Sequence, residues 1–148
     1  MTDYQLMIEE LSSLSEGVSC PVTILANASA LIWQSMNRLN WAGFYLVNDG
    51  ELVLGPFQGK VACTRIAFGK GVCGSCVLAD STLVVPDVHS FSGHIACDSA
   101  SNSEIVVPIH KDGAIYGVLD LDSPEFSRFT EEDRIGLESF VKEIEKYL

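Results

Sequence analysis

Basic residues are scarce in this sequence. Its 148 residues include 9 lysines and arginines against 20 aspartates and glutamates, which gives a formal net charge of −11 at pH 7. A field of this sign repels phosphate backbones, and the sequence has no cluster of lysine or arginine that could attract them locally. The composition therefore argues against a nucleic-acid partner.

Long hydrophobic runs are absent as well. Nowhere do about 18 apolar residues follow one another without interruption, as a membrane-spanning helix requires. The N-terminal residues, MTDYQLMIEE, have neither the basic segment nor the apolar core of a secretory signal. We therefore expect a cytoplasmic protein that does not contact membranes.

The sequence also has no low-complexity segment, no internal repeat and no evident linker. Hydrophobic residues make up 47% of it, which is enough to bury a core in a chain of this length. We expect one globular domain spanning residues 1–148.

The first pattern that is present concerns secondary structure. Apolar residues at helical spacing predict two helices before Trp41, and Thr130 followed by Asp133 predicts the start of a C-terminal helix. Turn sequences at residues 48–50 (NDG) and 111–113 (KDG) predict hairpins among β-rich segments. The pattern predicts an α+β fold, in which a mostly antiparallel sheet carries the N- and C-terminal helices on one face. The predicted core positions of the first two helices are Tyr4, Met7, Leu11, Leu14, Ile24, Ala28, Leu31 and Ile32, and the predicted strand segments are WAGFYLV, ELVLGPF, VACTRIAF, LVVPDV, EIVVPIH and AIYGVLDLD.

The five cysteines suggest thiol chemistry. A structural disulfide framework is not expected in a chain without an export signal, and structural zinc is disfavoured because Cys73 and Cys76 form an isolated C-x-x-C where the zinc signature pairs two such motifs. Redox chemistry needs at least two cysteines brought together by the fold. Cys63 on a predicted strand, Cys73 in a glycine-rich turn and Cys97 in a polar loop could border one pocket, whereas Cys20 and Cys76 are expected to be small buried apolar residues.

Three carboxylates form a second candidate cluster. Asp120 and Asp122 alternate with leucines in VLDLD, so they share one face of a strand. Glu104 opens the neighbouring segment EIVVPIH, and hairpin pairing could bring it close to them. Such a group lies either on a solvated face of the sheet or around a cavity that binds an ammonium group, where one carboxyl could keep a proton because its pKa is raised.

Trp41 and Tyr45 alternate on another predicted strand. An aromatic pair of this kind most often belongs to a core. At the mouth of a sheet, however, Trp41 could form the wall of a pocket and donate its indole N–H to an oxygen.

Several long strings resemble the free methionine-(R)-sulfoxide reductase family, whose single domain has a GAF fold. They are NWAGFY, GPFQGKVAC, GKGVCG, VVPDVHSFSGHIACDSASNSEIVVPI and GVLDLDSP, and the resemblance covers nearly all of the chain from Trp41 onward. It implies an enzyme that reduces the R-sulfoxide of free methionine and does not act on methionine within a peptide.

The resemblance also implies roles for the cysteines. Cys97 takes the position of the nucleophile, Cys63 that of its resolving partner, and Cys73 that of a supporting or alternative thiol, while Cys20 and Cys76 lie outside the family pattern. The expected substrate-binding residues are Trp41, Tyr45, Glu104, Asp120 and Asp122.

The chemistry of the sulfoxide dictates what else is needed. A thiolate attacks the sulfur only if the oxygen is protonated or strongly hydrogen-bonded, so we expect one of the three carboxyl groups to act as the acid. The attack would leave Cys97 as a sulfenic acid, which Cys63 or Cys73 would convert to a disulfide. The family implies thioredoxin as the reductant, recharged by NADPH through thioredoxin reductase, and we expect no bound cofactor and no metal.

Two other functional classes stay open at this point, as does the formation of a homodimer through the terminal helices. A GAF-type module that senses a small molecule would bind its ligand without turnover. A zinc-stabilised interaction domain would contain stoichiometric metal.

Overall fold

The computed structural model describes residues 1–93 and 100–148. In these ranges the helices are α1 (Tyr4–Ser15), α2 (Pro21–Ser35), α3 (Gly71–Ala79) and α4 (Glu131–Glu145), with a short 3-10 helix at Val88–Ser90. The strands are β1 (Trp41–Asn48), β2 (Glu51–Gly59), β3 (Arg65–Ala67), β4 (Leu83–Val85), β5 (Ser103–Lys111) and β6 (Ala114–Ser123). No helix in the described part of the chain is both long and apolar enough to cross a bilayer.

The strands form one antiparallel sheet in the order β3-β2-β1-β6-β5-β4. Both predicted hairpins are present, with Asp49 and Gly50 between β1 and β2, and Asp112 and Gly113 between β5 and β6. All four of these turn residues have positive φ, which gives a turn whose twist matches that of the strands it joins. The two hairpins meet where β1 pairs with β6 at the centre of the sheet.

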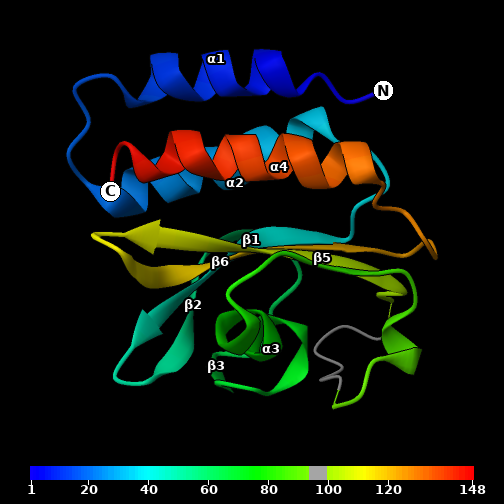
Figure 1. Ribbon diagram of the computed structural model, residues 1–148. Coiled ribbons are helices and arrows are strands. Elements are labelled where there is room, and N and C mark those ends of the chain that lie inside the picture. Colours follow the sequence, from blue (N-terminus) through cyan, green and yellow to red (C-terminus); the bar gives the residue numbers. More distant parts are fainter. Residues whose placement is uncertain (94–99) are drawn as a thin grey trace.

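Helices cover both faces of the sheet (Figure 1). α2 and α4 lie on one face, α1 lies over these two helices and farther from the sheet, and α3 lies on the opposite face. Phe44, Leu119 and Leu121 point from the sheet into the core beneath α2 and α4. The predicted α+β architecture, with a mostly antiparallel sheet and the terminal helices on one side, is confirmed, with the addition that α1 packs mainly on α2 and α4.

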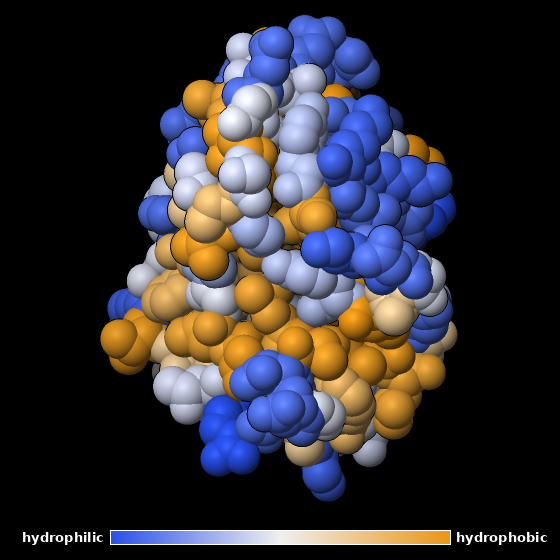
Figure 2. All heavy atoms as spheres, turned by 90° about the vertical axis from the view of Figure 1, so that its left-hand side faces the viewer, coloured by the Kyte–Doolittle hydropathy of each residue, from blue (hydrophilic) through white to orange (hydrophobic). Residues whose placement is uncertain are grey.

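The surface follows the same layers. Figure 2 shows the side of the molecule that carries the two hairpin turns and the C-terminus. Hydrophilic residues predominate in its upper, helical part, and apolar residues gather in the lower part, over the sheet and α3.

The predicted helix start at Thr130 is also confirmed, because its side chain and that of Asp133 cap each other's backbone N–H.

One predicted core position of the first helix is wrong. Leu14 is 48% exposed, whereas Ser15 is buried. Helical spacing after Leu11 allows either position to follow it. The packing of α1 continues along the i, i+4 row of Met7, Leu11 and Ser15, and this row turns Leu14 toward solvent.

The segment VACTRIAF is a strand only at Arg65–Ala67, so the prediction that Cys63 lies on a strand is wrong. Strand pairing with β2 covers Val53 to Glu51 and is followed by one further backbone contact, from the N–H of Leu54 to the carbonyl of Thr64 at 3.0 Å. Residues 61–64 are irregular. Cys63 therefore lies in a loop beside the sheet.

Gly74, within α3, lets that helix lie against the edge strand β3. A Cβ atom on Gly74 would lie 2.5 Å from the carbonyl oxygen of Ala67 in β3, closer than any real contact. The absence of a side chain at Gly74 therefore lets the helix backbone approach the strand. This approach places the first turn of α3, with Cys73, over the face of the sheet opposite to α2 and α4.

Gly136 in α4 accommodates the ring of Tyr4, and Gly136→Ala is expected to destabilise the protein. The added Cβ would lie 2.2 Å from the Tyr4 ring, whose hydroxyl donates to Asp133 at 2.6 Å. On an exposed helix the same change stabilises by about 1 kcal/mol, but here overpacking predicts a loss of about 1–3 kcal/mol in the free energy of unfolding. Urea denaturation measures the difference.

The matched control for this change is Ser139→Ala, at an exposed position of the same helix. It is expected to alter the free energy of unfolding by only a few tenths of a kcal/mol. If Gly136→Ala raised stability, the close contact with Tyr4 would carry no weight in the folded protein.

Candidate active site

Strand register brings the predicted substrate-binding residues into rows on one face of the sheet. Trp41 of β1 lies opposite Asp122 of β6, and Asp122 lies opposite Glu104 of β5. Asp120 follows two residues before Asp122 and so points to the same face. Three neighbouring strands thus bring an aromatic ring and three carboxyl groups together, as the alternation in VLDLD predicted.

A pocket lies between this face and the first turn of α3. It contains about 540 Å³ of space without protein atoms, part of which is open to solvent. All five predicted substrate-binding residues line it, and so does Cys73. The complete set of lining residues is Trp41, Tyr45, Val61, Ala62, Ile66, Lys70, Gly71, Val72, Cys73, Ser101, Glu104, Asp120 and Asp122.

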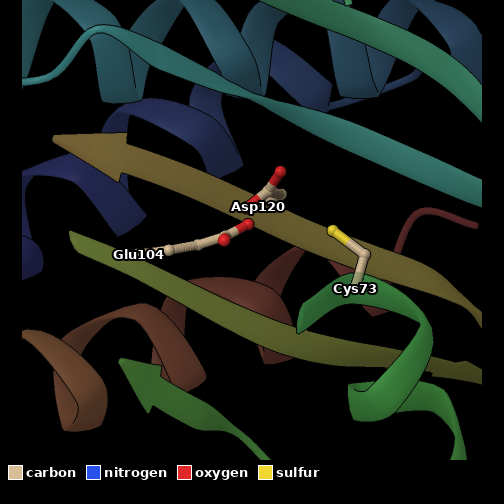
Figure 3. Close-up of side chains that lie close together, drawn as sticks. All are labelled: Cys73, Glu104 and Asp120. Atoms are coloured by element: carbon tan, nitrogen blue, oxygen red, sulfur yellow. The ribbon is translucent and has the colours of Figure 1, made fainter. Parts of the chain in front are cut away.

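Glu104, Asp120 and Cys73 point toward one another at the base of this pocket (Figure 3). An oxygen of each carboxyl group and the Cys73 sulfur all lie within 4.8 Å of one another, and all three side chains are buried. Burial, and then the charges of Asp120 and Asp122, raise the pKa of Glu104 well above its ordinary value. The Glu104 carboxyl group therefore keeps its proton when an exposed glutamate would be ionised.

Asp120 is the acceptor of this cluster. Burial raises the pKa of Asp120, and hydrogen bonds from Glu104 and Cys73 act in the opposite direction. No N–H or hydroxyl group among the residues that the structure describes donates to its buried Oδ1 atom. A buried carboxylate oxygen without any donor is costly, and the ammonium group of a ligand or a protonated carboxyl group could supply one.

The free thiols differ in their surroundings. Burial is the largest cause that raises the pKa of Cys73 well above its ordinary value, followed by the charges of Asp120 and Glu104. Burial also raises the pKa of Cys76 to about 12, and its thiol donates to the carbonyl groups of Ser81 and Val106. The prediction of a buried Cys76 is confirmed. The prediction of a buried Cys20 is wrong, because Cys20 is exposed at the N-terminus of α2. The pKa of Cys20 is lowered, and the largest cause is a hydrogen bond from the backbone N–H of Thr23.

This difference predicts the order of alkylation of the reduced protein. Only a thiolate reacts with iodoacetamide, so Cys20 is expected to react at least about tenfold faster than Cys73 and Cys76. Peptide mass spectrometry after timed quenching measures the three rates, and unfolding in urea serves as the control that should equalise them. A Cys73 labelled as fast as Cys20 in the folded protein would contradict the burial of its thiol.

Trp41 and Tyr45 form the aromatic wall of the pocket. Their rings stack with centroids 5.7 Å apart, and Trp41 also stacks on Phe57 at 5.1 Å. The indole N–H of Trp41 donates to an oxygen, the carbonyl of Lys60, at 3.1 Å. The hydroxyl of Tyr45 donates to the carbonyl of Cys63 at 2.9 Å.

The remaining predicted cysteines lie around this wall or outside the described residues. Cys63 packs beside the aromatic cluster and is disulfide-bonded. Cys97, the predicted nucleophile, falls within residues 94–99 and so lies outside the described residues. The structure thus brings Cys73 and the five substrate-binding candidates together, with Cys63 in the adjacent loop.

Sequence reasoning missed the lining residues that come from loops. Lys70 is the N-cap of α3, and no side chain caps that end of the helix. Lys70, Gly71 and Val72 all line the pocket. A helix start after the segment GKG was a usable signal for Lys70. Val61 and Ala62 gave no such signal, because apolar residues in a loop have the same appearance as those in a strand.

The cluster also has the composition of a metal site. The Cys73 sulfur and the oxygens of Glu104 and Asp120 are ligand types that zinc accepts. A metal ion would have to displace the protons that burial keeps on Cys73 and Glu104, so its binding would depend on pH.

Known proteins share this architecture. The GAF domain family matches residues 12–148. The free methionine-R-sulfoxide reductase of Escherichia coli (strain K12) is 50% identical over 145 residues, which cover 98% of this chain and 88% of that protein.

Solved structures agree over nearly the whole chain. The reduced form of fRMsr of Staphylococcus aureus has 52% identity and a TM-score of 0.97, covering 100% of this chain and 96% of that one. The free methionine-R-sulfoxide reductase from Neisseria meningitidis, in complex with its substrate, has 44% identity and a TM-score of 0.94, covering 97% of this chain and 87% of that one. The chain therefore belongs to the GAF-domain family and, within it, to the free methionine-R-sulfoxide reductases.

Proposed function

We propose that this protein reduces free methionine-R-sulfoxide to methionine through a thiol and recycles that thiol through a disulfide. The relatives from Escherichia coli and Neisseria meningitidis bear the name of this activity, and the latter was solved with its substrate. The observation that carries the proposal is the buried Glu104 carboxyl group beside Asp120 at the base of the pocket, because sulfoxide reduction requires an acid next to the reacting oxygen and burial raises the pKa of Glu104.

The pocket offers complementary surfaces to the two ends of the substrate. Asp120 and Asp122 would bind the α-ammonium group, which supplies the donor that Oδ1 of Asp120 lacks. Methionine within a peptide has an uncharged amide at this position and would leave the buried Asp120 carboxylate without its charged partner, which is a physical basis for specificity. The rings of Trp41 and Tyr45 suit the sulfur and methyl group of the side chain.

The reaction proceeds in two steps. The Cys97 thiolate attacks the sulfoxide sulfur while Glu104 protonates the oxygen, so that methionine leaves and Cys97 becomes a sulfenic acid. The Cys63 thiol then attacks this sulfur, water leaves, and a disulfide forms. Two observations favour Cys63 over Cys73 as the resolving thiol, since Cys63 is disulfide-bonded and the pKa of Cys73 is raised by burial, which keeps it as a thiol.

An external dithiol must reduce the disulfide to complete the cycle. We propose thioredoxin for this step, with NADPH as the ultimate donor through thioredoxin reductase. The protein itself would then need no bound redox cofactor.

A coupled assay tests the proposal. NADPH consumption is expected with thioredoxin, thioredoxin reductase and the R epimer of free methionine sulfoxide, and neither the S epimer nor N-acetylmethionine sulfoxide should support it. Binding of the R epimer without turnover would instead favour a sensing GAF module. Activity that disappears with a chelator and returns with zinc would favour the metal site.

Peptide mapping of the protein after one turnover tests the thiols. The expected product is a disulfide between Cys63 and Cys97. A bridge that never includes Cys97 would overturn its assignment as the nucleophile.

A further inference from the structure

Two side chains of β1 hold the loop that carries Cys63. The indole N–H of Trp41 binds the carbonyl of Lys60 at 3.1 Å, and the hydroxyl of Tyr45 binds the carbonyl of Cys63 at 2.9 Å. These two contacts lie at the two ends of the segment 60–63, which connects β2 to β3 and is not part of a strand. Donors from side chains thus replace the ladder hydrogen bonds that a strand would have made there.

The two donors stand on a rigid base. Trp41 and Tyr45 are 3% and 2% exposed, and β1 pairs with β2 on one side and β6 on the other. Stacking of Trp41 between Tyr45 and Phe57 restricts the rings further. Burial raises the pKa of Tyr45 well above that of a free phenol, so its hydroxyl remains a donor at any working pH.

Tyr45 therefore has two separate contacts. Its ring lines the pocket, and its hydroxyl reaches past the pocket to the backbone of the cysteine proposed to resolve the sulfenic acid. The substitution Tyr45→Phe removes the second contact and keeps the ring.

We propose that Tyr45 is a positioning residue for Cys63, and that its hydroxyl sets the rate of disulfide formation more than the rate of methionine formation. This inference rests on the proposed function. In the step concerned, the Cys63 sulfur forms a bond to the sulfenic acid sulfur, the S–O bond breaks, and the oxygen leaves as water with the two protons of the thiol and the sulfenic acid. The attacking sulfur must lie in line with the bond that breaks, and a displacement of about 1 Å can slow such a step about 100-fold.

The test follows one turnover of the reduced Tyr45→Phe variant with methionine-R-sulfoxide. Methionine is quantified in quenched samples, the disulfide is quantified by mass after alkylation of remaining thiols, and a cyclic 1,3-dione traps sulfenic acid. We expect disulfide formation to slow at least about tenfold more than methionine formation, with trapped sulfenic acid accumulating. Equal slowing of both steps, or wild-type rates for both, would overturn the inference.

A control and a second readout make the result specific. Tyr116→Phe removes a hydroxyl from a half-buried tyrosine of β6 that packs against the helical core, and it should leave both steps at wild-type rates. Hydrogen peroxide converts a thiol to a sulfenic acid and water without any sulfoxide, so the rate of disulfide formation after peroxide treatment should show the same defect in Tyr45→Phe. Absence of methionine formation by the wild-type protein would refute the proposed function, whereas a normal peroxide-driven rate in Tyr45→Phe would refute this inference alone.

Discussion

Replacing Glu104 by glutamine lowers kcat/KM for methionine-R-sulfoxide by about 10²–10⁴-fold, the range that general acid catalysis supplies. The amide has nearly the same shape as the carboxylic acid but cannot give its proton to the sulfoxide oxygen. Because Glu104 is buried beside Asp120 and Asp122, its pKa is raised, which favours the acid form that the reaction needs. Single-turnover methionine formation, followed from acidic to alkaline pH, measures the effect.

The pH profile separates this role from a structural one. As the pH rises through the raised pKa of Glu104, the wild-type protein loses its acid and its rate should fall, whereas Glu104→Gln has no such alkaline limb. Glu132→Gln, on an exposed position of α4, is the control that should retain the wild-type rate and profile. If Glu104→Gln kept the full rate, the proton would have to come from another group, and Asp120 would be the next candidate.

Replacing Asp120 by asparagine should raise the KM for free methionine-R-sulfoxide by about 100-fold or more, because removal of one partner from a buried charge pair typically costs 2–5 kcal/mol of binding. The same change should stabilise the ligand-free protein. The reason is that a buried carboxylate whose Oδ1 lacks an N–H or hydroxyl donor among the described residues is replaced by a neutral amide. Initial rates and thermal denaturation of the same samples measure the two effects.

The stability difference should depend on pH in a defined direction. Burial raises the pKa of Asp120 above that of the unfolded chain, so its contribution to stability is complete below about pH 4 and is lost as the pH rises through the folded pKa. The wild-type protein should therefore lose more stability than Asp120→Asn between pH 4 and neutral pH. Asp112→Asn, in an exposed turn with positive φ that asparagine tolerates, is the matched control, and equal pH dependence of all three proteins would contradict the prediction.

Strand alternation and turn chemistry made much of the site predictable. The period of two in VLDLD fixes that Asp120 and Asp122 share a face, and the turn at residues 111–113 predicts that β5 pairs with β6. These are local rules, so they can be read from a short stretch of sequence. The pocket face of the sheet follows from them together with the apolar positions Leu119 and Leu121, which belong to the helical core. The exact pairing of Glu104 with Asp122 could not be read in this way, because it depends on a register shift between Ile109 and His110.

The loop of Cys63 could not be predicted in this way. VACTRIAF has the alternation of a strand, whereas the side-chain contacts to the carbonyls of Lys60 and Cys63 come from Trp41 and Tyr45, about twenty positions earlier in the chain. The exposure of Cys20 was missed because a cysteine was treated as an apolar residue regardless of its place in the chain. Cys20 precedes Pro21 and is therefore the N-cap of α2, a position that favours small polar residues.

The row of Trp41, Asp122 and Glu104 across three strands makes the pocket a reporter of correct sheet assembly. A slip of β5 by one residue against β6 would turn Glu104 into the apolar core beneath α4 and bring Ile105 to the pocket. Misaligned molecules would thus lack the site entirely and would not contain a weakened version of it. The fraction of a preparation that binds substrate should consequently equal the fraction with native strand register, which allows refolding yield to be counted by ligand titration.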